Sequence, residues 1–249
     1  MTNPAFSAVS KESLSDSVYR QLADKILRGE LPAGQALPAE RELSEALGVN
    51  RGAVREAIKR LQQARLVAVR QGGNSVVLDY LAEGGLELLA SLLVDSRGQL
   101  NTAVVRSIME MRSALAPDIA AAAAKRGGNG LADELDALLV LMRRDSGSLK
   151  ALQEHALAFW QKLVERCGNI AFRLAFNSMT QTYTPVRNSL AAVLQNEFRD
   201  LDNLAAIAAA VRRGDAEAAR SHGRLHVEIG RVALERALDA AEQAGGKVQ

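Results

Sequence analysis

"GVNRGAVREAIKRL", residues 48–61, combines an apolar helix face with a cluster of cations. Val54, Ile58 and Leu61 recur at the spacing of one helix face, and Asn50 stands where its side chain can cap the N-terminus of that helix. Four cations accompany the apolar face: Arg51, Arg55, Lys59 and Arg60. The segment therefore predicts an amphipathic helix that packs on a core and presents positive charge to an anion.

The flanking sequence predicts two more helices and a hairpin. "SVYRQLADKILRG" has helical periodicity, with Asp16 or Ser17 as the N-cap and Gly29 as the stop, and "AERELSEALG" predicts a short helix that Gly48 ends. "LVAVRQGGNSVVLDY" reads as two β-branched strands around a turn at 71–74. After a flexible tail at 1–14, residues 15–80 are thus expected to form a winged helix-turn-helix domain.

The rest of the chain predicts helices alone. We expect a linker and first bundle helix at 81–100, followed by an all-helical domain at 101–245. The predicted helices span 84–94, 101–126, 131–145, 149–167, 169–194, 198–213 and 215–243. The fold class is therefore mainly α: a winged helix-turn-helix followed by an antiparallel helical bundle.

Composition limits the classes of function. The chain has 249 residues and a formal net charge of +2, yet positions 51–70 hold six cations against Glu56 alone. Cys167 is the only cysteine, which excludes an intrachain disulfide and predicts a small buried apolar residue. No signal-peptide or membrane segment is visible, so we expect a cytoplasmic protein without a membrane partner. No nucleophile–base, phosphate-loop or paired-carboxylate motif favours an enzyme.

DNA is the anion that suits this arrangement. Side chains in the first turns of a recognition helix reach base edges, and an arginine donates two hydrogen bonds to guanine, so Arg51 and Arg55 are expected to read bases. Lys59, Arg60 and Arg70 lie further along and are expected to contact phosphates. A charged helix face that is merely solvated is the alternative.

Residues 29–67, "GELPAGQALPAERELSEALGVNRGAVREAIKRLQQARLV", resemble the DNA-binding domain of GntR-type bacterial transcription regulators. The resemblance implies operator contacts by the arginine of the Glu-Arg pair and by two recognition-helix arginines. Asn50 stands where Ser or Thr is usual, Arg65 where glycine is usual, and the wing reads Gly72-Gly73-Asn74 in place of Gly-x-Gly. The DNA-binding candidates are Arg41, Asn50, Arg51, Gly52, Arg55, Lys59, Arg70, Gln71 and Gly72.

Residues 101–228 resemble the FCD ligand-binding bundle of the FadR subfamily, in stretches such as "VVRSIMEMRSALAPDIAAAAAKR" and "AFWQKLVERCGN". Most such bundles hold a metal with one Asp and three His, and those positions fall on Ala156, Trp160, Leu204 and His226. Three of the four cannot ligate a metal, so we expect no metal and no cofactor. The alternative is a different site rebuilt from His155, His222 and His226.

Loss of the metal is shared with the acyl-CoA-responsive members of the FadR subfamily, and the resemblance implies a fatty acyl-CoA effector. Five aromatic residues lie within residues 159–183, either as bundle core or as the wall of an apolar pocket. The effector-binding candidates are Arg112, Phe159, Trp160, Phe176, Asn177, Tyr183, Arg187 and His226. The expected function is a homodimeric repressor on a palindromic operator. The alternatives are a response to a small organic acid and an effector-free DNA-binding protein.

Overall fold

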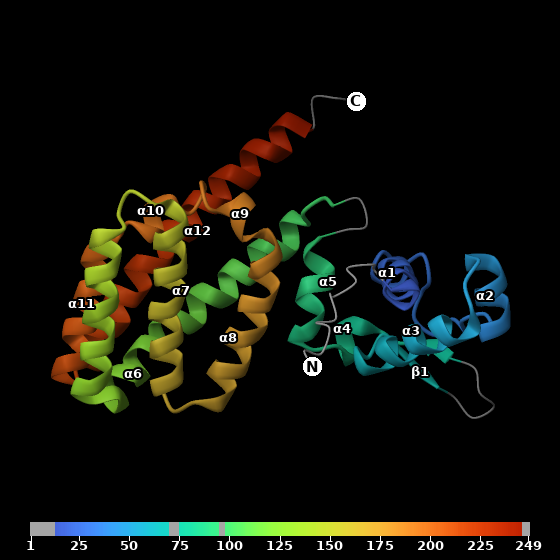
Figure 1. Ribbon diagram of the computed structural model, residues 1–249, viewed down its shortest axis with the longest axis horizontal. Helices are drawn as coiled ribbons and strands as arrows, with labels where there is room; N and C mark the ends of the chain where they lie inside the picture. Colours follow the sequence, from blue (N-terminus) through green and yellow to red (C-terminus); the bar gives the residue numbers. More distant parts are fainter. Residues whose placement is uncertain (1–12, 70–74, 95–97, 246–249) are drawn as a thin grey trace, which may run out of the picture. The chain divides into compact units, whose positions relative to one another are not determined.

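The computed structural model describes residues 13–69, 75–94 and 98–245, and it divides the chain into two compact units. The first unit is Met1–Leu100 and the second is Asn101–Gln249. Figure 1 shows the helices and strands of each unit. The protein is mainly α-helical, as predicted, and its only sheet within the described residues has two strands.

The first unit is a winged helix-turn-helix, which confirms the predicted fold. Its elements are α1 Leu14–Leu27, α2 Glu40–Leu47, α3 Arg51–Gln63, β1 Val67–Val69 and β2 Ser75–Val77. The apolar faces of the three helices bury Leu22, Leu43, Val54 and Leu61 in one core. The N-cap prediction for α1 was wrong: the Ser13 side chain, and not Asp16 or Ser17, caps this helix by accepting from the Asp16 amide.

The hairpin is antiparallel, with Val67 opposite Val77 and Val69 opposite Ser75. The predicted turn at 71–74 lies outside the described residues. The connection between α1 and α2 adds a third, irregular edge, because the Leu37 amide donates to the Ser75 carbonyl and the Val77 amide donates to the Gln35 carbonyl. The wing and the segment that leads into α2 are therefore joined by backbone hydrogen bonds.

Residues 80–93 form short helical pieces rather than the single helix predicted at 84–94. They are α4 Tyr80–Glu83, the 3₁₀ turn η1 Leu86–Leu88 and α5 Leu89–Leu93. Leu88 is buried in the core of the first unit, so this segment, expected to begin the bundle, packs on the DNA-binding unit.

The second unit is a helical bundle built around one long helix, α6. The elements are α6 Thr102–Arg144, α7 Leu149–Arg166, α8 Ile170–Tyr183, η2 Thr184–Val186, α9 Arg187–Leu190, α10 Gln195–Phe198, α11 Leu201–Arg213 and α12 Ala216–Gly245. Helix α6 packs against α7, α11 and α12, and Figure 1 shows these helices gathered along it. A single apolar core that includes Leu135, Phe159 and Leu204 holds the unit together.

Two helices of this unit are interrupted or ended near a glycine or a proline. The predicted break between 126 and 131 is present inside α6, where Gly128 has φ 61° and ψ −167°, a conformation open essentially to glycine alone. The predicted helix at 169–194 was wrong, because α8 ends at Tyr183. Thr184 keeps helical dihedrals, with φ −52° and ψ −45°, but Pro185 lacks the amide donor that would continue the α-helix, so the chain passes into the turn η2 instead.

The buried thiol of Cys167 confirms that this residue belongs to the core. The side chain is fully buried after the end of α7, and its sulfur donates to the Val164 carbonyl at 3.1 Å. Within the described residues, no helix has the length and apolar character needed to cross a membrane.

Candidate DNA interface and effector site

The outer face of α3 carries the exposed cations that the sequence predicted for DNA. The side-chain oxygen of Asn50 accepts from the Ala53 amide at 2.9 Å, which caps the helix at the position expected. Arg51, Arg55 and Lys59 are all exposed on the following turns, and Gly52 adds no side chain between them. The capped, electropositive N-terminus of α3 therefore presents its arginines directly to solvent.

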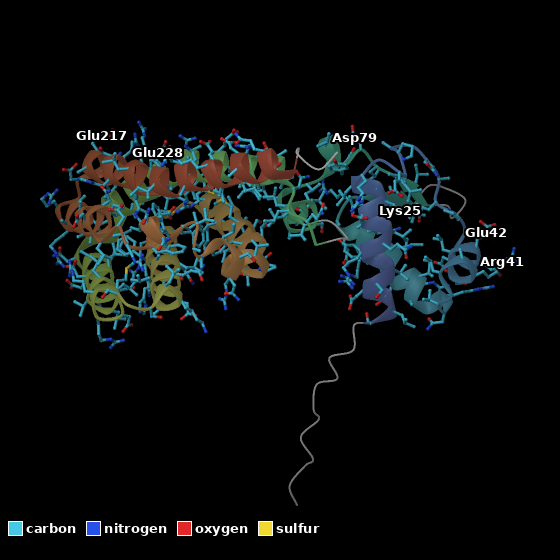
Figure 2. All side chains as sticks on the ribbon, turned by 90° about the horizontal axis from the view of Figure 1, so that it is seen from above. Lys25, Arg41, Glu42, Asp79, Glu217 and Glu228 are labelled. Carbon is cyan, nitrogen blue, oxygen red and sulfur yellow. The ribbon has the colours of Figure 1, made fainter. Side chains whose placement is uncertain are left out.

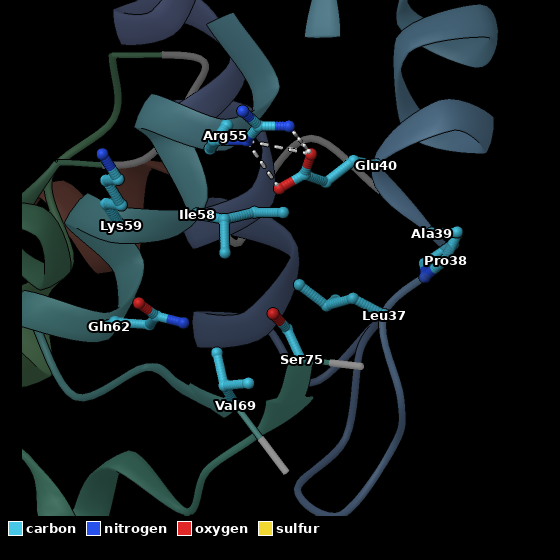
Figure 3. A pocket seen from close by; sticks show the side chains of 10 residues that line it. All are labelled: Leu37, Pro38, Ala39, Glu40, Arg55, Ile58, Lys59, Gln62, Val69 and Ser75. Atoms are coloured by element: carbon cyan, nitrogen blue, oxygen red, sulfur yellow. Dashed lines mark hydrogen bonds and ion pairs between the residues drawn. The ribbon is translucent and has the colours of Figure 1, made fainter. Parts of the chain in front are cut away.

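Arg55 is positioned by Glu40 at the start of α2. Its Nε and Nη2 atoms both donate to the Glu40 carboxylate, the closest contact being 2.9 Å, and this bond raises the pKa of Arg55. Figure 3 shows the pair at the rim of a hollow of about 200 Å³ that extends past Lys59 and Gln62 to Ser75 of β2. The guanidinium is thus oriented but stays exposed, which suits a side chain that must still meet a ligand.

The other predicted DNA-binding residues lie on α2 and the wing. Arg41 is exposed on α2, where Figure 2 shows it beside Glu42. Arg70, Gln71 and Gly72 fall outside the described residues. Arg60, which was expected to meet phosphate, bonds Asp16 of α1 and lies 4.3 Å from the centre of the Tyr19 ring. Its role in the structure is therefore to join α3 to α1.

In the bundle, Arg112 and His226 meet around a carboxylate that the sequence did not single out. Arg112 donates from both terminal nitrogens to Glu197, with Nη1 to Oε2 at 2.9 Å, and Glu197 is only 3% exposed. His226 is fully buried; its Nδ1 donates to Asp200 at 2.9 Å and its ring lies 6.0 Å from that of Trp160. Candidate residues from α6, α7 and α12 are thus brought together.

Asp200 supports this cluster from the turn before α11. Partial burial acts to raise its pKa, but hydrogen bonds from His226 and Asn203 outweigh burial and hold the pKa below the usual value. Asn203 also bonds His222 at 2.9 Å. The aspartate therefore fixes the ring orientation of His226.

Tyr183 and Arg187 form a neighbouring polar group through Gln153, a residue missed in the sequence. Gln153 Nε2 donates to the Tyr183 hydroxyl and, at 2.9 Å, to the Arg187 carbonyl. Burial raises the pKa of Tyr183, and the Glu197 charge adds to the effect. The remaining candidates differ in burial: Phe159 is fully buried, Phe176 is half-buried against the core, and Asn177 is exposed on α8.

The residues do not fit the metal that FCD bundles usually hold. Ala156 and Leu204 are buried apolar side chains, and Trp160 has no free lone pair to offer. Nor do His155 and His222 join His226, since His155 bonds Asp145 at 2.9 Å and His222 bonds Asn203. No cluster of three or more metal-ligating side chains occurs among the described residues. We therefore assign no chemistry here to a metal.

Four residues of these sites escaped the sequence analysis: Glu40, Gln153, Glu197 and Asp200. Glu40 directly precedes the predicted DNA contact Arg41, so the sequence places it near the DNA-binding surface. Its pairing with Arg55 could not be predicted from the sequence. Glu197 lies between the predicted helices 169–194 and 198–213, Asp200 lies near the start of the second, and no local pattern indicates that their side chains point inward.

A winged helix-turn-helix with exposed arginines on its third helix, joined to a helical bundle, defines a DNA-binding transcription regulator. Two family descriptions match the chain: bacterial regulatory proteins of the gntR family over residues 14–77, and the FCD domain over residues 107–229. The chain belongs to the GntR family, and its second domain is of the FCD type.

Known relatives agree with this assignment. The HTH-type transcriptional regulator Mce2R of Mycobacterium tuberculosis is 36% identical over 92% of this chain and 95% of its own. The fatty acid metabolism regulator protein of Edwardsiella ictaluri is 28% identical over 72% of each chain. Among solved structures, Lar, described as controlling the agr system of Listeria monocytogenes, matches 92% of this chain and 99% of its own with a TM-score of 0.51 and 19% identity. That likeness concerns the fold alone.

Proposed function

We propose that the protein acts in the cytoplasm as a homodimer that binds a palindromic operator through α3 and the wing. The observation that carries the proposal is the exposed pair Arg51 and Arg55 at the capped start of α3. These two side chains would read guanines in the major groove, with Asn50 and Gly52 allowing close approach. Arg41, Lys59, Arg70, Gln71 and Gly72 would contact the DNA backbone or the adjacent groove.

Single substitutions separate base reading from charge. Arg51→Ala and Arg55→Ala should each cost about 1–3 kcal/mol of specific binding and weaken the preference for the operator over other DNA. Lys59→Ala should weaken operator and unrelated DNA alike and reduce the salt dependence by about one phosphate contact. Titrations of fluorescent operator and scrambled duplexes at several salt concentrations measure both. Equal losses of specificity in all three variants would contradict the assignment.

For the effector we propose a long acyl compound, most simply a fatty acyl-CoA, whose binding releases the operator. Three of the four metal positions of the FCD bundle are apolar here, so a small carboxylate lacks its usual anchor. Each buried CH₂ of an acyl chain contributes roughly 0.8 kcal/mol. The side chains proposed to receive the chain are Phe159, Trp160 and Phe176, with Asn177, Tyr183, Arg187, Arg112 and His226 as polar contacts.

Relatives named as fatty acid metabolism regulators support this choice of effector. The test is a titration of the operator complex with acyl-CoAs of increasing chain length, in parallel with citrate, malonate and lactate. Affinity should rise with chain length. A hundredfold preference of the ligand for the DNA-free state corresponds to about 2.7 kcal/mol of coupling. Release by a small acid, with no response to any acyl-CoA, would favour an organic-acid sensor. No response at all would favour an effector-free regulator.

A further inference from the structure

Glu197 is held inside the bundle by a two-pronged contact with a cation. Arg112 Nη1 donates to Oε2 at 2.9 Å and Nη2 donates to Oε1, which is the geometry with which arginine binds a free carboxylate. The Glu197 side chain is 4% exposed and that of Arg112 is 25% exposed. A charge so well removed from water is retained only where a partner matches it.

The fold leaves room for this carboxylate and anchors the segment that carries it. Gly230 of α12 faces Glu197, and a Cβ at that position would overlap the carboxylate. Leu194, the N-cap of the short helix α10, and Phe198, its last residue, are both buried in the bundle core. Glu197 is therefore inserted from a short segment, between longer helices that supply the rest of the site.

Two further buried nitrogens lack hydrogen-bond partners among the described residues, and one of them lies near the carboxylate. His226 Nε2 lies 3.7 Å from Glu197 Oε1, and it has no hydrogen-bond partner among the described residues. The indole Nε1 of Trp160, whose ring is next to His226, is equally buried and unpaired. The Arg112–Glu197 contact is therefore buried near other polar atoms that lack hydrogen-bond partners among the described residues.

We propose that Glu197 is an internal ligand: its carboxylate fills a carboxylate-binding site centred on Arg112, beside His226, and a free carboxylate takes its place when Glu197 is removed or withdrawn with α10. The proposal does not depend on the acyl-CoA effector. It implies that an acidic effector reaches Arg112 only by expelling Glu197. In an ordinary structural ion pair, by contrast, loss of one partner simply strands the other.

The experiment is carboxylate rescue of Glu197→Ala in the full-length protein. Thermal unfolding is followed in acetate, formate and propionate against chloride at equal ionic strength. The melting temperature of the variant should rise by about 3–6 °C for each tenfold increase in acetate above its dissociation constant. The wild-type protein should show no such rise, because Glu197 already occupies the site.

Two further variants serve as controls. Glu228→Ala, at a residue labelled in Figure 2, removes one of the two carboxylate partners of Arg231 in a more exposed cluster on α12 and leaves Glu235 in place, so acetate should not rescue it. Glu197→Ala combined with Arg112→Met removes the cation of the site and should abolish the rescue. Rescue that persists in this double variant would overturn the proposal, as would a Glu197→Ala protein that responds equally to chloride and acetate.

The stability of Glu197→Ala itself is also informative. If the variant fails to fold in chloride, the proposal expects folded protein when it is refolded in acetate. Failure in both salts would overturn the proposal.

Discussion

Arg65 has an unfavourable, left-handed backbone conformation in the DNA-binding unit. It has φ 53°, the only positive φ recorded for a non-glycine residue in the described chain, directly after the C-cap of α3. Its side chain gains only a 3.5 Å contact to the Glu83 carbonyl. This conformation explains why glycine is usual at this position in the GntR-type domains that the chain resembles: the residue after the recognition helix must adopt a left-handed conformation.

Replacement of Arg65 by glycine should stabilise the first unit by about 0.5–1 kcal/mol, because relief of the left-handed strain exceeds the entropy that glycine loses on folding. Urea unfolding followed by circular dichroism measures the change. The matched control is Ala64→Gly at the neighbouring position, where φ is −80°. That change should destabilise, so a loss of stability in both variants would contradict the explanation.

The Glu40–Arg55 pair makes a separate prediction about DNA. Because the bond orients the guanidinium, Glu40→Gln should lower the ratio of operator to non-specific affinity by about two- to fivefold, the range expected for an exposed ion pair. Glu56→Gln on α3 also removes one negative charge but leaves the Glu40–Arg55 pair intact, so it should not change the ratio of operator to non-specific affinity. Competition binding against scrambled duplex measures the ratio; equal effects of both changes would indicate simple charge loss.

Among the elements, α6 shows how one glycine divides a helix. Gly128 allows α6, which packs on α7, α11 and α12, to change direction within its length. The sequence predicted this break from its run of glycines, whereas the break before Pro185 was missed because the apolar periodicity continues through it. Apart from the segment 84–94, which forms short helical pieces, the other predicted helices were recovered with shifts at their ends, since the periodicity of apolar residues follows from which face is buried.

Gly128→Ala should lower the free energy of unfolding of the bundle by about 1–3 kcal/mol, because alanine tolerates this φ and ψ poorly. Gly130→Ala is the control: it lies two residues on, has no positive φ and has open space at the Cβ position. It should leave stability unchanged or raise it by up to about 1 kcal/mol. A similar loss in both would contradict the assigned role of Gly128.

The connection from α6 to α7 should respond to acid. Hydrogen bonds from Arg144 and then His155 hold the pKa of Asp145 well below its ordinary value. A carboxyl group whose folded pKa is depressed stabilises the protein above its unfolded pKa of about 4, and this contribution is lost as the pH falls towards the folded value. Asp145→Asn should therefore flatten the decline in stability below about pH 4. Urea midpoints across pH 3–7 test this; curves of equal slope would contradict it.

At the scale of the whole molecule, the two-unit design was predictable, but the interior of the bundle was not. Arginines on a capped helix and a following hairpin indicate DNA binding, and this function could be predicted because both features are short local patterns in the sequence. The Arg112–Glu197 contact joins residues 85 positions apart, and no periodicity indicates such a pairing. The roles of the individual DNA and effector contacts stay predictions.

The proposed homodimer can be tested by its mass and by its stoichiometry on the operator. In the proposed homodimer, two-fold symmetry would place two recognition helices on paired half-sites, so sedimentation should give the mass of two chains, and two chains should bind each operator. Scrambling one half-site should weaken binding far more than scrambling the central spacer. A monomer that binds a single half-site with full affinity would contradict the proposal.

Because the thiol of Cys167 is buried, the native protein is suited to site-specific labelling for fluorescence energy transfer. The chain has no other cysteine, and this one is fully buried, so a maleimide dye should react only with a thiol introduced on the surface. Glu45→Cys, at an exposed position of α2, would place a fluorophore on the DNA-binding unit without any change to the core. Energy transfer between two such labelled chains would then follow the separation of their α2 helices as acyl-CoA is added.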